Sequence, residues 1–119
     1  MALFRARSQD RDRSSDQHRL ATLVRHIGDV RSGVVRERRG LERRYADTVA
    51  VAAQLVDTDY GGERESEDET QLARAESDVL YARRRMAELD RQLDLLDGLT
   101  ERVKVMFDPP EELKKRRQS

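Results

Sequence analysis

The sequence predicts an all-α fold: an antiparallel two-helix coiled-coil hairpin that assembles into a helical bundle as an oligomer. Two long stretches carry apolar residues at alternating spacings of three and four, a glycine pair separates them, and a helix-capping pattern precedes each one. The composition agrees with this fold. Of the 119 residues 40% are charged and 4% are aromatic, which leaves too few large apolar side chains for a multilayer core.

The first predicted helix covers residues 15–58. With Leu20 at heptad position a, eight of the twelve a and d positions are apolar, and the exceptions include Glu37 and Arg44, both at d. We expect this polar interruption to set register or partner choice rather than to perform chemistry. Residues 1–14 before the helix are expected to form a flexible basic segment.

The second predicted helix covers residues 67–107 and has the stronger pattern. From Leu72 to Phe107, ten of its eleven a and d positions are apolar. A turn over residues 59–66 joins the two helices, and residues 108–119 are expected to form a short charged tail.

Local signals support these helix boundaries. A serine followed three residues later by Gln or Glu forms a capping box, in which the serine hydroxyl accepts a hydrogen bond from the third backbone amide of the helix. Proline lacks the amide that would continue a helix and disfavours α conformation in the preceding residue. The two capping boxes are Ser14 with Gln17 and Ser66 with Glu69, and the stop is Pro109 with Pro110.

The glycine pair also predicts the register of the hairpin. In an antiparallel pair each a position of one helix faces a d position of the other, and here the numbers of two facing residues must sum to either 123 or 130. A sum of 123 places the apex of the turn between Gly61 and Gly62, which tolerate positive φ. The predicted facing pairs are Leu41 with Ala82, Val34 with Leu89, Ile27 with Leu96, Leu20 with Val103, and Val30 with Leu93.

Apolar residues outside the seam predict a further partner. The stretch from Val49 to Val56 is apolar at seven of eight positions and therefore all around the helix, and its expected facing segment, residues 67–74, is largely polar. We expect a homodimer to bury these residues, together with a second stripe on the other helix. The predicted oligomer patch is Val49, Val51, Ala52, Leu55, Val56, Leu95, Leu99 and Met106.

Arginine is concentrated in two runs that the register brings to one level of the hairpin. They are RERRGLERR and ARRRM, and together they predict an arginine belt that could meet phosphates or an acidic protein surface. A solvated, salt-bridged face is the simpler explanation, because the chain has zero formal net charge and no aromatics interleaved with the arginines. The belt is Arg36, Arg38, Arg39, Arg43, Arg44, Arg83, Arg84 and Arg85.

The turn region resembles part of a calcium-binding loop. With Asp57 as the first position, Asp59 falls at the third and Gly62 at the sixth, as in helix-flanked calcium loops. The fifth position is Gly61, which has no side-chain oxygen, and the twelfth is Asp68, where such a loop needs a bidentate glutamate. An acidic turn explains the stretch better, and we expect no metal ion or other cofactor.

Other features exclude several classes of function. The chain has no cysteine, so it has no thiolate metal site or Cys nucleophile, and this fits a cytoplasmic location. No apolar run approaches the roughly 20 residues of a membrane helix. No phosphate-binding glycine loop or catalytic constellation is present, and the protein is not expected to be an enzyme.

The sequence therefore predicts a non-enzymatic protein–protein interaction module, a coiled-coil adaptor, chaperone-like protein or assembly factor, acting through exposed helix faces on its own copy and on another protein. The alternative is a nucleic-acid-associated helical protein that uses the arginine belt. In general architecture the pattern is similar to the small coiled-coil hairpins of bacterial secretion and flagellar export. It lacks the W-x-G signature of secreted helical hairpins, since it has no tryptophan.

Overall fold

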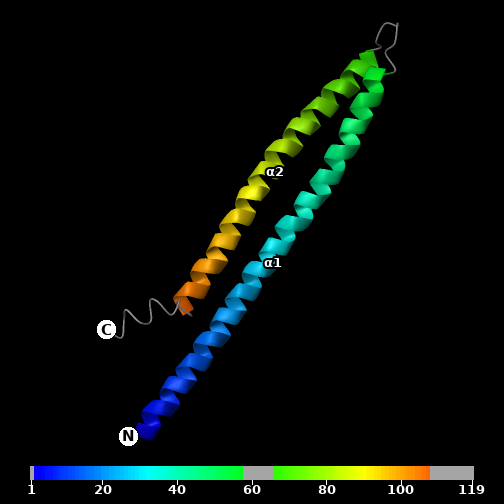
Figure 1. Ribbon diagram of the computed structural model, residues 1–119. Coiled ribbons are helices and arrows are strands. Elements are labelled where there is room, and N and C mark those ends of the chain that lie inside the picture. The colour runs from blue at the N-terminus through cyan, green and yellow to red at the C-terminus, as the bar shows by residue number, and fades with distance from the viewer. Residues whose placement is uncertain (1, 58–65, 108–119) are drawn as a thin grey trace. The chain divides into compact units, whose positions relative to one another are not determined.

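The computed structural model describes the backbone over residues 2–57 and 66–107, and the side chains over residues 8–56 and 66–107. These residues form two α-helices, α1 (Ala2–Asp57) and α2 (Ser66–Phe107), and no strand occurs in these two ranges (Figure 1). The predicted fold class, an all-α helical hairpin, is confirmed. The predicted turn and charged tail lie outside the described residues.

Each helix contributes to two units of structure. Residues Met1–Ser32 and Asp94–Ser119 belong to one, here called the terminal unit, and residues Gly33–Leu93 belong to the other, the central unit. Both units contain ion pairs between α1 and α2.

The start of α1 differs from the prediction. The helix begins at Ala2, thirteen residues before the expected start at residue 15, so the segment 1–14 that was expected to be flexible is helical from Ala2 onward. Ser14 lies inside the helix and does not cap it. The segment contains neither glycine nor proline, and extending an existing helix avoids the cost of nucleation, so nothing in this segment terminates α1.

The boundaries of α2 and the end of α1 agree with the prediction to within one residue. Glu67, Asp68 and Glu69 occupy the first turn of α2, where carboxylates interact favourably with the positive end of the helix dipole. The Thr70 hydroxyl donates a hydrogen bond of 2.9 Å to the Ser66 carbonyl, which anchors the same turn.

The buried residues lie where the two heptad patterns meet. In the described chain they are all aliphatic, and no buried side-chain nitrogen or oxygen lacks a partner. The central unit buries Val34, Leu41, Ala75, Ala82 and Leu89, and the terminal unit buries Ile27 and Val103. All seven are a positions of α1 or d positions of α2, as the heptad assignment predicts.

The rest of the α1 seam is different from the prediction. The d positions Leu23, Val30 and Val51 are 38%, 57% and 51% exposed, whereas the e positions Tyr45 and Ala52 are half-buried. The predicted pairing of Val30 with Leu93 is therefore wrong, because Val30 does not lie in the seam. α1 packs through its a and e rows, whereas α2 packs through a and d.

The polar residues at d explain this rotation of α1. Glu37 and Arg44 were expected to lie in the seam, yet both are exposed. A charge buried opposite apolar side chains is strongly unfavourable. Turning the d row to the rim leaves both groups exposed, and Arg38 at position e is half-buried.

Ion pairs between the helices agree with the predicted register in the central unit. Glu37 pairs with Arg85, and these numbers sum to 122, close to the predicted 123. A sum of 130 would separate the two residues by about 12 Å along the helix axes, since each residue rises about 1.5 Å. Arg38 pairs with Asp90, and their numbers sum to 128, so in the predicted register the two Cα atoms are offset by about 7.5 Å along the helix axes. Helical side chains lean toward their own N-terminus, so these two side chains lean toward each other across this offset.

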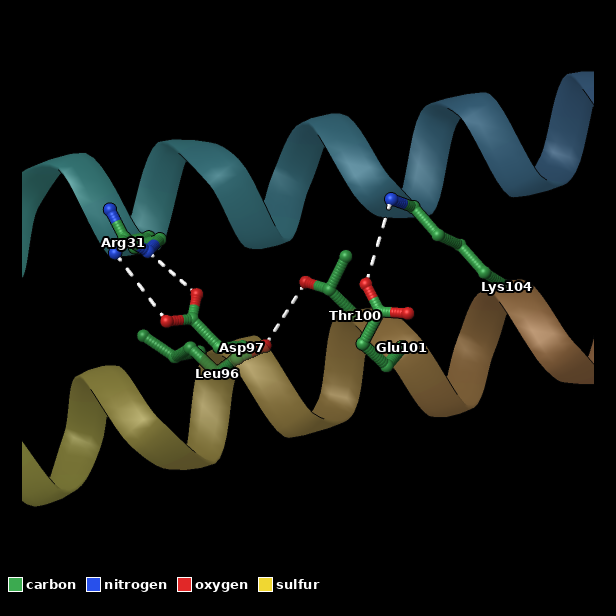
Figure 2. A network of polar contacts seen from close by, with 6 residues as sticks. All are labelled: Arg31, Leu96, Asp97, Thr100, Glu101 and Lys104. Atoms are coloured by element: carbon green, nitrogen blue, oxygen red, sulfur yellow. Dashed lines mark hydrogen bonds and ion pairs between the residues drawn. The ribbon is translucent and has the colours of Figure 1, made fainter.

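The terminal unit is held by a similar pair. Arg31 donates to both carboxylate oxygens of Asp97, from Nε at 2.8 Å and from Nη2 at 3.5 Å (Figure 2). Nearby on α2, the Thr100 hydroxyl donates to the Leu96 carbonyl at 3.0 Å, so the polar group in this heptad a position is satisfied. The unit is thus an apolar seam flanked by a bidentate ion pair.

Candidate functional site

The arginine belt is not one continuous surface. Arg38 donates to Asp90 through Nε at 2.5 Å and Nη2 at 3.3 Å, and to Glu42 through Nη1 at 3.4 Å. Arg85 donates to both oxygens of Glu37, at 2.7 and 3.3 Å, and to Glu88 at 3.0 Å. These two arginines therefore join α1 to α2 and are already paired with carboxylates.

The same hydrogen bonds shift the acidity of the paired groups. The bond from Arg85 lowers the pKa of the Glu37 carboxyl, and the bond from Arg38 lowers the pKa of Asp90. The pKa of each guanidinium is raised in turn by its carboxylate partners. Both ion pairs therefore stay charged throughout the neutral range.

Three other belt arginines line the outer surface of α1. Arg36, Arg39 and Arg43 surround a shallow hollow with Glu42 and Ala46, all within the one helix. Their spacing of three and four residues places them on one face, pointing away from α2. This arrangement is the solvated charged face that the sequence also allowed.

Arg44 and Arg84 lie on another side, in a groove of about 450 Å³ between the helices of the central unit. The Arg84 guanidinium lies 6.0 Å from the centre of the Tyr81 ring, and Arg44 donates to the Gly40 carbonyl at 3.4 Å. The carboxylates of Glu37 and Glu88 line the same groove, so it carries both signs of charge.

An apolar groove opens on the opposite side of the central unit, with a volume of about 330 Å³. Val49 and Ala52 of α1 form one wall, and Val79 and Leu80 of α2 form the other. Leu80 is 65% exposed and Val49 is 41% exposed. Ala75 and Glu76 complete the described lining, and among these six residues Glu76 is the only charged one.

The groove exists because small residues face each other where the seam crosses this level. Ala52 and Ala75 are too short to fill the space between the two backbones, and Leu80, at heptad position b, turns outward beside it. The result is a concave apolar surface between two rigid helices, the kind of surface that receives apolar side chains of a partner helix.

The members of the predicted oligomer patch belong to both units. Val49 and Ala52 line the apolar groove, whereas Val51 lines a separate hollow with Asp47, Arg74 and Asp78. Leu55 is half-buried, and Val56 is 53% exposed. The three α2 members lie in the terminal unit, where Leu95, Leu99 and Met106 are 73%, 47% and 68% exposed.

The prediction that the Val49–Val56 stretch faces a polar segment needs a correction. Val49 and Ala52 share their groove with Ala75, Val79 and Leu80 rather than with residues 67–74 alone. Sequence reasoning missed Leu80 because, outside the a and d rows of α2, it considered only the stripe of Leu95, Leu99 and Met106. The signal was present, since Ala73, Leu80 and Ala87 recur every seven residues at position b.

No metal centre occurs in the part of the chain that is described: residues 2–57 and 66–107 contain no group of three or more His, Asp or Glu placed to hold an ion. The acidic turn considered for calcium falls mainly on residues 58–65, outside the described residues. Within the two described helices, no stretch has both the length and the apolar character that crossing a bilayer requires.

Comparison of the chain with protein-family models, with curated proteins and with solved structures finds no match. The physical features of the two units therefore carry the functional argument. The stability of the hairpin does not explain the apolar groove. Larger side chains in the seam would fill it and leave less apolar surface exposed to water, so the open groove calls for a functional explanation.

Proposed function

We propose that this protein is a non-enzymatic interaction module whose docking surface is the apolar groove of the central unit. The observation that carries the proposal is the pairing of exposed Leu80 and Val49 across a concave surface floored by alanine. An isolated exposed leucine is common on protein surfaces, whereas an exposed groove lined by apolar residues and a single charged one is uncommon.

The groove suits a helical partner. A hydrophobic groove between two helices accepts apolar side chains spaced three and four residues apart on a third helix. Glu76 and Arg83, both exposed on row e of α2 beside Leu80, supply polar groups at the edge of the apolar face. The cysteine-free composition supports action in the cytoplasm.

Photo-crosslinking tests this function. Benzoylphenylalanine in place of Leu80 should form a covalent adduct with a protein in cells of the native host, because the probe would lie in the interface. The matched control carries the same probe in place of Arg39, an exposed residue on the outer surface of α1. Equal adduct yields at the two positions would refute a docking role for the groove.

The alternative is a nucleic-acid-associated protein, which the exposed stripe of Arg36, Arg39 and Arg43 favours. Its test is retention of duplex and single-stranded DNA or RNA on a filter across a range of salt. Replacing all three arginines with glutamine should then abolish salt-dependent retention. Absence of retention by the unmodified protein would eliminate this alternative.

A further inference from the structure

We propose that the occupant of the apolar groove is a second copy of this chain, with its α2 packed antiparallel against α2 about a two-fold axis at Leu80. This inference rests on the proposed function, because it uses the same groove. It adds the identity of the partner, the symmetry of the assembly and the residues that set its register.

The first support is the spacing of apolar residues on the exposed face of α2. Ala73, Leu80 and Ala87 are one heptad apart, and all three are exposed. In an antiparallel pair centred on Leu80, residue numbers that face each other sum to about 160. Leu80 then meets Leu80 of the other copy and Ala73 meets Ala87, so a large residue at the axis is flanked by small ones that allow close approach.

The second support is charge complementarity. Glu76 and Arg83 lie one heptad apart at the e row beside Leu80, and both are exposed. Within the described chain neither side chain has an ion pair or hydrogen bond. Their numbers sum to 159, so the register that pairs the leucines also places Glu76 of each copy beside Arg83 of the other.

This arrangement is self-complementary, which is the requirement for a two-fold interface. Residue 76 meets residue 83 and residue 83 meets residue 76, so each dimer contains two opposite-charge contacts. A parallel two-fold pair would instead place row e of each copy beside row f of the other, so Glu76 would lie near Ser77 and Arg83 near Arg84, a like-charge contact. Charge therefore favours the antiparallel dimer over the parallel one.

The surrounding charges are compatible with this register. It brings Glu69 of one copy near Asp90 of the other, a like-charge contact. Asp90 already accepts two hydrogen bonds from Arg38 of its own copy, so its charge is largely compensated. On α1, Val49 and Ala52 form the wall that receives Leu80 of the second copy.

Charge reversal tests the register directly by sedimentation velocity. Each single variant, Glu76→Arg or Arg83→Glu, converts both opposite-charge contacts of its own dimer into like-charge contacts, so its dimer should dissociate at least about tenfold more readily. An equimolar mixture of the two variants should regain dimers, because the heterodimer has two opposite-charge contacts again. The double variant should also dimerise with itself.

The outcomes separate this inference from the proposed function. A wild-type chain that stays monomeric overturns the second-copy inference, while the crosslinking experiment still decides whether the groove binds another protein. A wild-type dimer that is insensitive to both reversals, or a mixture that regains no dimer, overturns the antiparallel register. Circular dichroism of each variant is the folding control, and since both residues are exposed its helix content should equal that of the wild type.

Discussion

Leu89 is the most completely buried side chain of the central unit, with 1% of its surface exposed. Replacing it with alanine removes buried apolar atoms and leaves a cavity between rigid helices, which we expect to lower the free energy of unfolding by about 2–4 kcal/mol. Urea denaturation at a fixed chain concentration measures this change. Leu95→Ala is the matched control, because Leu95 is 73% exposed and its truncation should change stability by less than about 0.5 kcal/mol.

Gly28 lies inside α1, and apart from its chain neighbours and the backbone of the adjoining helical turns, no heavy atom lies within 4 Å of a methyl group built on its Cα. Gly28→Ala should therefore raise the free energy of unfolding by about 0.5–1 kcal/mol, since alanine loses less backbone entropy than glycine on helix formation. Thermal and urea denaturation both measure it. A loss of stability would show that this helix face is covered by something that does not tolerate a methyl group.

At the scale of single helices, the heptad pattern predicted α2 better than α1. In α2 the a and d positions are nearly all apolar, so pattern and packing coincide. In α1 the d row is interrupted by Glu37 and Arg44, and the helix rotates to place both at the rim. Counting apolar positions could not predict this rotation of α1. The count treats every non-apolar residue alike, although burying a charged side chain costs far more free energy than burying a small polar one.

The ion pairs between the helices were not predicted, although their signal is visible in hindsight. Arg31 and Arg38 are one heptad apart at position e of α1, and Asp90 and Asp97 are one heptad apart at position e of α2. The e rows of an antiparallel pair flank the same side of the seam. The arginine belt, in contrast, was inferred from two arginine runs that the register brings to one level, and the structure divides its members among several surfaces.

These ion pairs predict a specific response to acid. The pKa of Glu37 is lower in the folded chain than in the unfolded chain, where it is about 4.3. The contribution of this carboxylate to stability is therefore fully present above the unfolded-state pKa and is lost as the pH falls through the folded-state pKa. Melting temperatures at pH 7, 4 and 3 should fall less steeply for Glu37→Gln than for the wild type. Glu101→Gln is the control, since its contact with Lys104 at 3.8 Å lies within one helix. Equal pH dependence in all three proteins would contradict a role for the Glu37–Arg85 pair in stability.

At the scale of the whole molecule, the sequence predicted a further apolar partner for the Val49–Val56 stretch but not the surface that would meet it. Residues from both helices form the groove, and which residues share it depends on the rotation of α1. The sequence alone therefore could not separate Val49 and Ala52, which line the groove, from Val51, which lines a different hollow.

The apolar groove also predicts the effect of a single substitution. Leu80→Glu introduces a carboxylate at the centre of the proposed interface, where it would face the same charge in the second copy. We expect dimers to be lost on size-exclusion chromatography with no loss of helix content, because a charge buried without a partner is strongly unfavourable. Leu95→Glu is the matched control and should leave the elution volume unchanged.

The most direct test of the central claim, an antiparallel dimer of α2 about Leu80, is the distance between identical spin labels in the two copies. The chain has no cysteine, so a single introduced cysteine carries one label per copy. Labels at Ser77→Cys should be separated by about 9 Å along the helix axes and labels at Arg91→Cys by about 33 Å, because antiparallel positions diverge by about 3 Å per residue from the axis. Equal distances at the two positions, as in a parallel dimer, or no dipolar coupling at either position, would contradict the claim.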